Sequence, residues 1–479
     1  MKIPFYWCLA RGEKISKKLA WRKYPIVILK LLRNIRLRVE IKNKSNFKLA
    51  LNSILPDLNI SEISGITIDS RMVKPGDIFL AFKGEFTDGH KYIGQAEKAG
   101  ASLIIVENNI ETSLSVIQVK STRNFLNDLA ASYRKYITCP IIGITGSNGK
   151  TTTKDLLTHV LSASMDTMST IGNFNSTIGV PLSLFECSGN EDIAIIEMGA
   201  SIPGEIEYIC NIVQPNMGII TNIFEAHLER FGDINEVAIT KSALFSSLSK
   251  NGVAFINMDD PFISKMSTPC KGLEYSFTKS SDFQGSWSSD KKTLTINNIA
   301  INISTASETM GMNALAVFSI ASHLGMADYV IKTQIESFQL PPGRGNFLKF
   351  QDITVINDSY NANLESARSG INNLTSLSEG KRKIAVIGDM LELGELEKVH
   401  HQTLGKYLSE KKVDAVFAFG DLTQHTIKAM NGAAMFHQFY NDKADLLTDL
   451  KAFISKGDII YVKGSRGMKM EDVIKGLQN

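Results

Sequence analysis

The segment from Gly143 to Thr151, GITGSNGKT, has residue types and spacing that can bind phosphate. It matches G-x-x-x-x-G-K-[ST], in which glycines let backbone N–H groups surround an anion and a helix N-terminus adds partial positive charge. Lys150 can reach the β- and γ-phosphates, and the Thr151 hydroxyl can bind Mg²⁺. The pattern requires a strand before the loop and a helix after it. Apolar Ile141–Thr145 and helically spaced Lys154–Ser162 predict both.

Three residues farther along the chain can bind a metal or assist phosphate chemistry. Glu197 ends the apolar strand Ile193–Ile196. Ligands gather at the carboxyl ends of strands in open α/β sheets, so this carboxylate is a natural Mg²⁺ ligand. His227 follows another predicted strand, where a lone histidine suits packing or surface exposure as well as metal binding. Lys241 lies in a predicted helix, Glu236–Leu248, and the sequence alone favours an exposed helical lysine there.

The last part of the chain holds four polar segments, each at or just after a predicted strand end. Such loops can line a ligand cleft, although turn formation alone would also explain each one. Arg344 could pair with a nucleotide phosphate, and Asp358 could accept hydrogen bonds from a ribose. Four such loops in one unit favour a shared ligand surface. The segments are Gly343–Gly345, Asn357–Asn363, Gly388–Gly394 and Lys463–Arg466.

The elements that must position these residues fall into three units. Residues 46–137 predict a small mixed α/β domain. Residues 138–340 alternate strands with helices, which predicts a central, doubly wound parallel-sheet domain around the phosphate loop. A Pro-Pro-Gly linker leads into residues 341–479, a C-terminal Rossmann-like α/β domain. The predicted class is therefore α/β with three domains. The predicted strands are Ile66–Ile68, Ile78–Phe82, Leu103–Val106, Ile141–Thr145, Ile193–Ile196, Met217–Ile220, Val253–Ile256, Val355–Asn357, Lys383–Ile387, Ala415–Phe419 and Ile459–Val462.

Composition excludes several classes of protein. A chain of 479 residues suggests about three domains. With 43% hydrophobic and 21% charged residues, it resembles a globular protein rather than a disordered, collagen-like or polytopic membrane protein. The five cysteines are scattered and lack zinc-ligand spacing, so a disulfide framework is not expected. This usage fits a reducing compartment and predicts a cytoplasmic location.

Charge is distributed unevenly along the chain. Residues 1–48 carry 14 Lys/Arg and 2 Asp/Glu, whereas the remainder carries 38 and 47. The body therefore lacks the basic surplus that nucleic-acid binding usually needs, and no nucleic-acid partner is expected.

The basic extension, residues 1–45, has no apolar stretch longer than the nine residues from Tyr24 to Leu32. That is too short to span a bilayer. Peripheral contact with an anionic membrane and an organellar transit peptide both remain open. The favoured interpretation is an extension without chemistry, such as one from an upstream start codon.

The motifs taken together resemble those of the ATP-dependent Mur ligases of peptidoglycan synthesis. Within that family the chain is most similar to the branch that joins D-alanyl-D-alanine to UDP-N-acetylmuramoyl-tripeptide. The resemblance covers about residues 60–475, and the Asp-Asn-Pro-Arg element of the branch that adds the third amino acid is missing. The segments that carry it are DSRMVKPGDIFLAFKGEFTDGH (69–90), GITGSNGKTTTKD (143–155), EMGAS (197–201), EAHLERFGD (225–233), NDSYNAN (357–363), GDMLELGE (388–395) and KGSRGMKME (463–471).

The resemblance implies roles for the central motifs. The phosphate loop matches the family's ATP site. Thr151 and Glu197 match ligands of a first Mg²⁺, and His227 matches a ligand of a second. Lys241 falls on a lysine that family members carbamylate, and an anionic carbamate could bind metal where an ammonium would repel it. Lys150, His227 and Lys241 are then the implied catalytic residues.

The resemblance also implies three sets of binding residues. The UDP-sugar would contact Ser70, Arg71, Thr87, Asp88 and His90. ATP would contact Gly143, Thr145, Gly146, Ser147, Asn148, Gly149, Lys150, Thr151, Thr152, Asn257, Arg344 and Asp358. The acceptor side would include Asn361, Asn363, Lys463, Ser465 and Arg466.

The expected activity is ATP-dependent amide ligation through an acyl phosphate, with two Mg²⁺ ions, in a monomer. The chain departs from the family pattern at Ser176, at Leu364 and over Ser304–Met312, and none of these removes a phosphate-loop or metal residue. Two alternatives remain. One is a different amide ligase of the superfamily, such as another Mur step or a folylpolyglutamate synthetase. The other is a catalytically silent, membrane-associated nucleotide-binding protein.

Overall fold

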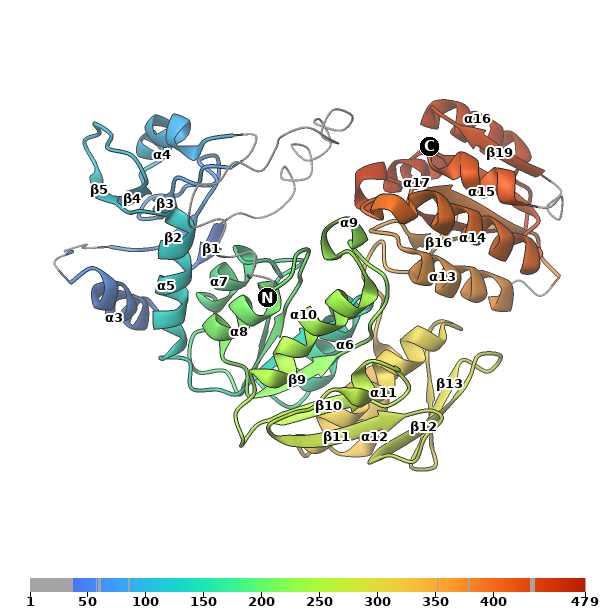
Figure 1. Cartoon of the computed structure of the whole chain (residues 1–479), viewed down its shortest axis with the longest axis horizontal. Helices are drawn as coiled ribbons and strands as arrows, with labels where there is room; N and C mark the ends of the chain where they lie inside the picture. Colours follow the sequence, from blue (N-terminus) through green and yellow to red (C-terminus); the bar gives the residue numbers. More distant parts are fainter. Residues whose placement is uncertain are drawn as a thin grey trace, which may run out of the picture. The chain divides into compact units, whose positions relative to one another are not determined.

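The computed structural model describes residues 38–56, 58, 62–84, 87–350, 352–377, 380–430 and 436–478. Residues 1–37 of the basic extension lie outside the described residues, so the hypotheses about this part of the chain stay predictions. Among the described residues, no helix is both long enough and apolar enough to cross a bilayer. Within the same residues, the strands form three sheets, one in each predicted unit (Figure 1).

The first sheet has the strand order β1-β2-β3-β4-β5, with β1 antiparallel to β2 and the other pairs parallel. Strands β3 and β4 are buried along their length, which suits the central strands of a covered parallel sheet. Phe79 and Ile104 pack against Ile93 and Ala96 of helix α4. The elements are β1 (Arg38–Glu40), α3 (Lys44–Ile54), β2 (Gly65–Thr67), β3 (Ile78–Leu80), α4 (Ile93–Lys98), β4 (Leu103–Val106), β5 (Ser115–Gln118) and α5 (Thr122–Arg134).

This sheet begins before the boundary predicted at residue 46. Strand β1 pairs with β2, and Arg38 donates to Asp77 through Nε at 2.7 Å and through a terminal guanidinium nitrogen at 2.8 Å. Residues 38–45 thus belong to the folded first domain rather than to the extension. The prediction missed them because Arg38, Glu40 and Lys42 give this short segment the charge of the residues before it.

The central sheet has the order β14-β13-β12-β11-β10-β9-β6-β8-β7 and is parallel from β7 to β12. The phosphate loop leaves β6, which lies between β8 and β9. The elements are β6 (Ile141–Thr145), α6 (Lys150–Leu161), β7 (Thr167–Ser169), α7 (Gly179–Leu184), β8 (Ile193–Glu197), α8 (Glu205–Val213), β9 (Met217–Ile220), α9 (Leu228–Phe231), α10 (Ile234–Ser246), β10 (Val253–Asn257), β11 (Lys271–Ser276), β12 (Phe283–Ser288), β13 (Thr293–Ile296), β14 (Ile299–Asn302), α11 (Glu308–His323) and α12 (Asp328–Ser337).

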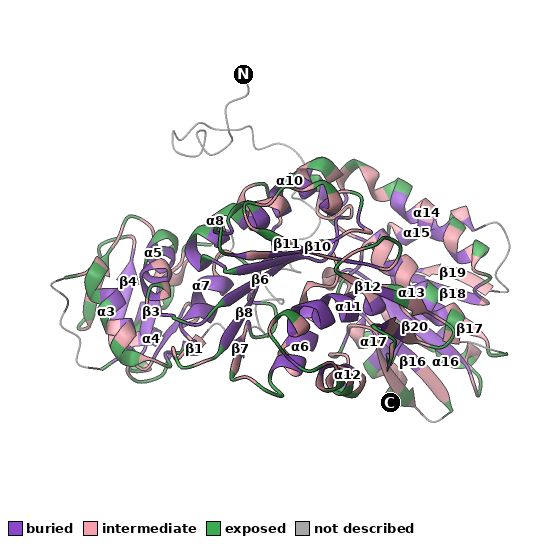
Figure 2. Ribbon diagram, turned by 90° about the horizontal axis from the view of Figure 1, so that it is seen from below, coloured by how far each residue is buried: buried purple, intermediate pink, exposed green. Residues whose placement is uncertain are grey.

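Alternating side chains of β6 pack on opposite faces of this sheet. Ile142 and Ile144 enter a core with α6 and α11. Between them, Gly143 faces the other way, where an added Cβ would lie 2.8 Å from the Leu244 side chain of α10. Gly218 of β9 approaches the same leucine. Helices therefore cover both faces, as a doubly wound sheet requires. Figure 2 shows β6 and β8 buried along their length.

Strands β12, β13 and β14 pair antiparallel with one another and extend the central sheet, and they were not predicted from the sequence. They are short and pair in antiparallel register, with Trp287 opposite Leu294 and Leu294 opposite Ile301. Their polar residues alternate with a few buried ones, so they lack the continuous apolar run that marks the parallel strands.

The third sheet has the order β15-β16-β20-β17-β18-β19, with only the β15–β16 pair antiparallel in the described part of the chain. Ile356 and Tyr461 face a core with α13 and α14, whereas Val355 and Ile460 face one with α16 and α17. The elements are β15 (Asn346–Phe350), β16 (Ile353–Asp358), α13 (Leu364–Leu377), β17 (Lys383–Gly388), α14 (Glu397–Glu410), β18 (Ala415–Phe419), α15 (Thr423–Ala429), β19 (Phe436–Tyr440), α16 (Lys443–Phe453), β20 (Ile459–Lys463) and α17 (Glu471–Gln478).

The predicted α/β class with three domains is confirmed. Every strand predicted from the sequence is present, and most end within one residue of the expected position. Among the predicted strands and helices named above, the largest difference in a boundary is at the start of α6, which begins at Lys150 rather than Lys154. Its first turn contains three consecutive threonines, whose branched side chains weakly disfavour helix, but the glycine before Lys150 provides the left-handed residue that opens it.

Asp389 is a buried carboxyl group that should make stability depend on pH. Burial raises its pKa to about 7, although the backbone N–H groups of Thr423 and Leu422 partly oppose the shift by donating to its Oδ1. An unfolded aspartate has a pKa of about 3.9. The folded state therefore holds the proton more tightly, and stability falls as pH rises from about 4 to about 7.

We expect Asp389→Asn to remove this loss, because an amide keeps the Oδ1 acceptor and does not ionise. The difference in melting temperature between the variant and the wild type should grow from pH 4 to pH 7 and then level off. Thermal unfolding monitored by circular dichroism checks this. A difference that is constant across that range would contradict the burial argument.

Candidate active site

The phosphate loop takes a conformation that only glycine tolerates at two positions. Gly146 has φ +148°, and an added Cβ would lie 1.9 Å from Thr221 Oγ1. Gly149 has φ +79° and immediately precedes α6. The loop therefore ends at a helix N-terminus, whose unpaired N–H groups and dipole favour an anion.

A neighbouring segment after β9 holds the loop in place. Ser147 N–H donates to the Asn222 carbonyl at 2.9 Å, and Asn148 N–H donates to Asn222 Oδ1 at 2.8 Å. Thr221 Oγ1 donates to the Asn148 carbonyl at 2.6 Å. The sequence analysis did not single out Thr221 and Asn222. Their place directly after β9, the neighbour of β6, is a signal that could have identified them.

Lys150 lies at the first position of α6, and its side chain turns back over the loop. Nζ donates to the Gly146 carbonyl at 2.6 Å and to the Ser147 carbonyl at 3.1 Å. Burial lowers the pKa of Lys150 to about 8, while Glu197 opposes this and Arg344 adds to it. The amine of Lys150 thus lies against its own loop, and its contact with the β- and γ-phosphates stays a prediction from the motif.

Glu197 lies at the end of β8 and is fully buried. Its Oε1 accepts hydrogen bonds from Asn175 Nδ2 at 2.7 Å and from Thr151 Oγ1 at 3.1 Å. Its Oε2 is buried and has no hydrogen-bond partner among the described residues. A buried carboxylate oxygen without a donor, beside a threonine hydroxyl, is a donor set that suits Mg²⁺. Asn175 was missed by the sequence analysis because only folding brings it to Glu197.

Arg344 connects the C-terminal domain to this cluster. One of its terminal nitrogens donates to Thr151 Oγ1 at 3.1 Å. Its guanidinium carbon lies 3.7 Å from the centre of the Tyr360 ring, a cation–π contact. Arg344 therefore lies beside the phosphate loop, and its pairing with a nucleotide phosphate stays a prediction.

His227 adopts a left-handed backbone conformation with φ 53° at the start of α9. Its Nδ1 pairs with Glu392 Oε2 of the C-terminal domain. The residues described in the structure contain no group of three or more His, Cys, Asp or Glu side chains arranged to hold a metal. The role of His227 at a second Mg²⁺ therefore stays a prediction.

Lys241 is 3% exposed, so the sequence-only interpretation as an exposed helical lysine is wrong. It lies four residues after Val237 and three before Leu244, on the buried face of α10. This i, i+4, i+7 stripe is a signal that periodicity could have revealed. Burial lowers the pKa of Lys241 well below its usual value, and the nearby charge of Lys150 adds to the effect, against an opposing contribution from Glu205.

Two residues assigned to different ligands form one ion pair. Lys463, expected on the acceptor side, donates through Nζ to Asp358 Oδ2 at 2.6 Å, and the Tyr461 hydroxyl donates to the same oxygen at 3.0 Å. Asp358 was expected at the nucleotide. Asn257, also expected there, donates through Nδ2 to the Thr221 carbonyl at 3.1 Å and so lies beside the phosphate-loop support.

The other acceptor-side residues have varied surroundings. Asn363 exchanges hydrogen bonds with Asn148 of the phosphate loop. Arg466 pairs with Glu471 at 2.8 Å, and its backbone N–H donates to Asn361 Oδ1 at 3.3 Å. Ser465 Oγ accepts from the Leu391 N–H at 2.9 Å.

The predicted UDP-sugar residues all lie in the first domain, away from these contacts. Arg71 is exposed and pairs with Asp69, whereas Ser70 donates to Gln95 Oε1 at 2.9 Å. Thr87 contacts the Tyr92 hydroxyl at 3.4 Å. His90 Nδ1 lies 2.6 Å from Asp88 Oδ1, and its Nε2 accepts from the Glu107 N–H. Nδ1 of His90 therefore stabilises the turn at Asp88, and Nε2 joins this turn to the residue after β4.

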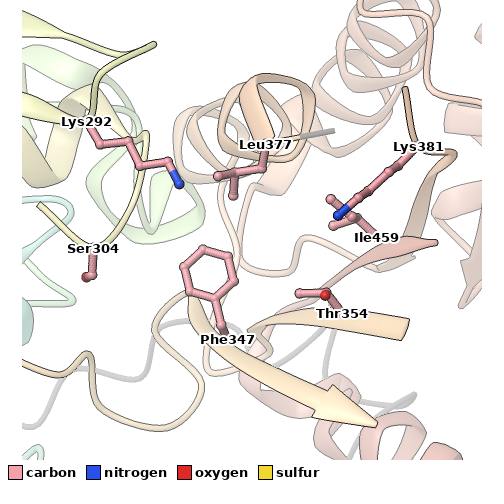
Figure 3. A pocket seen from close by; sticks show the side chains of 7 residues that line it. All are labelled: Lys292, Ser304, Phe347, Thr354, Leu377, Lys381 and Ile459. Atoms are coloured by element: carbon pink, nitrogen blue, oxygen red, sulfur yellow. The ribbon is translucent and has the colours of Figure 1, made fainter. Parts of the chain in front are cut away.

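A pocket of about 240 Å³ is lined by side chains that include Phe347, Thr354 and Ile459 (Figure 3). Thr354 and Ile459 come from the amino-terminal ends of β16 and β20, whereas Asp358 and Lys463 end the same strands. The pocket is thus separate from the candidate active site. Its lining residues are Lys292, Ser304, Phe347, Thr354, Leu377, Lys381 and Ile459.

Asn175→Ala tests the arrangement around Glu197. Loss of the Nδ2 donor should leave the carboxylate less well oriented, and outer-sphere changes of this kind typically cost about 10- to 100-fold in metal affinity. We expect a higher Mg²⁺ concentration for half-maximal ADP binding, measured by titration calorimetry. The control is Asn173→Ala, an exposed residue of the same loop. Equal Mg²⁺ dependence in both variants would contradict the proposed orienting contact.

Comparisons with known proteins agree with this geometry. Residues 62–134 match the model of the Mur ligase family, catalytic domain, residues 144–321 match the Mur ligase middle domain, and residues 343–466 match the Mur ligase, glutamate ligase domain. Among curated relatives, the UDP-N-acetylmuramoyl-tripeptide–D-alanyl-D-alanine ligase of Bacillus subtilis is 33% identical, covering 88% of this chain and 94% of the relative. The corresponding ligase of Escherichia coli is 31% identical, covering 89% and 96%.

Solved structures give the same result. A crystal structure of MurF from Acinetobacter baumannii has a TM-score of 0.81 and 29% identity, covering 91% of this chain and 98% of that one. MurF ligase from Thermotoga maritima in complex with ADP has a TM-score of 0.77 and 28% identity, covering 86% and 96%. The domain order, the phosphate loop and these relatives lead to one conclusion: the chain belongs to the Mur ligase family.

Proposed function

We propose that this chain is an ATP-dependent ligase that joins D-alanyl-D-alanine to UDP-N-acetylmuramoyl-tripeptide in peptidoglycan synthesis. Its curated relatives of 31–33% identity carry that activity in their names and align over nearly their whole length. The observation that carries the proposal is the meeting of Thr151, Glu197 and Arg344, which joins a phosphate loop to a C-terminal domain.

The reaction follows from two substrates that cannot condense unaided. A carboxylate oxygen of the tripeptide attacks the γ-phosphorus of ATP, the bond to the β-phosphate oxygen breaks, and ADP leaves. The amine of D-alanyl-D-alanine then attacks the acyl carbon. Phosphate departs with one of the original carboxylate oxygens, and the amine loses a proton. No protein nucleophile is needed, because ATP provides the leaving group.

The first step brings two anions together, so the chain must supply positive charge. Lys150 donates to a carbonyl of the loop, and Arg344 from the C-terminal domain donates to Thr151, so both cations can stabilise the transferred phosphoryl group. Thr151 and Glu197 would hold a first Mg²⁺, which supplies charge neutralisation for the phosphates when bound.

Buried Lys241 supports a second ligand site. Burial lowers the pKa of Lys241 and so favours its neutral form, and only a neutral amine can react with CO₂ to form a carbamate. With His227, carbamylated Lys241 would then hold a second Mg²⁺, as the resemblance implies. Both assignments are proposals.

The substrate assignments in the outer domains are likewise proposals. Exposed Arg71 is available to a UDP-sugar, whereas Ser70 and His90 are engaged within the first domain. Asn361, Ser465 and Arg466 form a linked group at the ends of β16 and β20, which suits an acceptor peptide site. Peripheral membrane contact through residues 1–45, a monomeric state and a cytoplasmic location stay predictions from the sequence.

The most informative test is an ADP-release assay with ATP, Mg²⁺ and UDP-N-acetylmuramoyl-tripeptide, with D-alanyl-D-alanine present or omitted. We expect sustained ADP release only when both building blocks are present, together with formation of the pentapeptide product. Sustained release with a different amine and none with D-alanyl-D-alanine would indicate another amide ligase of the superfamily.

Lys150→Ala should reduce ligation by at least about 10²- to 10³-fold, because loss of one preorganised charge at a transition state has an effect of this size. The fold should survive, since the side-chain hydrogen bonds of Lys150 to the described residues go to carbonyls of its own loop. Pentapeptide formation and circular dichroism check both points. Lys250→Ala, an exposed lysine of the same domain, is the control. Ligation by Lys150→Ala at the wild-type rate would refute the assigned role.

A further inference from the structure

The phosphate loop and the C-terminal domain share a second contact besides Arg344. Asn148 Nδ2 donates to Asn363 Oδ1 at 3.2 Å, and Asn363 Nδ2 donates to Asn148 Oδ1 at 2.8 Å. The two amides thus form a reciprocal pair between residues 215 positions apart. We call this pair the amide clamp.

The amide orientation of Asn363 is fixed from its own side. Asn363 precedes α13, and its Oδ1 accepts the Ser366 N–H at 2.9 Å, as an N-cap residue does. The same Oδ1 of Asn363 also accepts from Asn148 Nδ2, because a carbonyl oxygen can accept two hydrogen bonds. This orientation leaves Asn363 Nδ2 to donate to Asn148 Oδ1. Asn363 therefore has two separable tasks: it caps α13 and it contacts the phosphate loop.

The backbone of Asn148 is fixed independently of the clamp. Its N–H donates to Asn222, and its carbonyl accepts from Thr221 and Asn222. Only the side chain is left to reach the C-terminal domain. The clamp thus joins a backbone-anchored part of the loop to the start of α13. The position of one therefore restrains the position of the other.

We propose that Asn363 is a positioning residue for the phosphate loop, which through the amide clamp holds the C-terminal domain and Arg344 against Thr151. The contribution of Asn363 to ligation rests on the proposed function. Its effect on nucleotide binding does not. The sequence analysis expected Asn363 on the acceptor side. The clamp means that nucleotide binding and docking of the C-terminal domain are coupled, because each favours the arrangement that the other needs.

Asn363→Ser separates the two tasks of this residue. Serine is as good an N-cap as asparagine, so α13 keeps its cap, but its short hydroxyl cannot reach Asn148. The variant introduces no charge near the phosphates. Ser366→Ala is the matched control, because the Ser366 hydroxyl exchanges hydrogen bonds with the Asn363 backbone and takes no part in the clamp.

The experiment is a double-mutant cycle on the full chain, with Asn363→Ser, Asn148→Ala and their combination. The measured quantity is the dissociation constant of ADP in the presence of Mg²⁺, obtained by titration calorimetry. Each single variant should weaken ADP binding by about five- to tenfold, the size expected for one or two net hydrogen bonds. The double variant should bind ADP no more weakly than the single variant with the lower affinity. Ser366→Ala should bind ADP with the wild-type affinity.

Wild-type affinity in Asn363→Ser, or losses in the double variant that multiply, would overturn the clamp. Melting temperatures of Asn363→Ser and Ser366→Ala distinguish a folding defect from a binding defect. Because ADP binding is measured without ligation, the two proposals fail separately. If the cycle shows coupling but the wild type makes no pentapeptide, the clamp stands and the proposed function does not.

Discussion

The hydroxyl of Thr151 is a point at which the central and C-terminal domains meet. It donates to Glu197 at the end of β8 and accepts from Arg344, which follows the interdomain linker. Lys150 is the residue before Thr151 in the same helix. This geometry is possible only because β6 and β8 are neighbours in the central sheet. The order of the strands therefore decides which charges surround the phosphate loop.

Burial of charge is the second constraint. Glu197 is fully buried and its Oε2 has no hydrogen-bond donor among the described residues, and Lys241 is nearly as deeply buried next to the charge of Lys150. Unpaired buried polar groups destabilise a fold. The ligands proposed above, a cation at the carboxylate and phosphates at Lys150, would complete this arrangement. The destabilisation from these buried groups falls at the site where the proposed ligands would offset it.

The sequence predicted those features that local patterns determine. The phosphate loop follows from glycine and lysine spacing, and the parallel strands follow from short apolar runs. Asn175, Thr221 and Asn222 were missed because their contribution is a tertiary contact with a residue far along the chain. Lys241 was misjudged from its residue type, although its helical stripe places it inside. No local pattern shows that the amide of Asn363 reaches Asn148, and its acceptor-side role, implied by the resemblance, stays a prediction.

The central claim is that the loop at Lys150 promotes transfer of the γ-phosphoryl group to a peptide carboxylate. It can be tested with UDP-N-acetylmuramoyl-tripeptide labelled with ¹⁸O in the carboxylate that forms the new amide bond. Mass spectrometry of the released inorganic phosphate gives the answer. The account predicts one ¹⁸O atom in each phosphate formed with the pentapeptide. Unlabelled phosphate accompanying full product formation would contradict it.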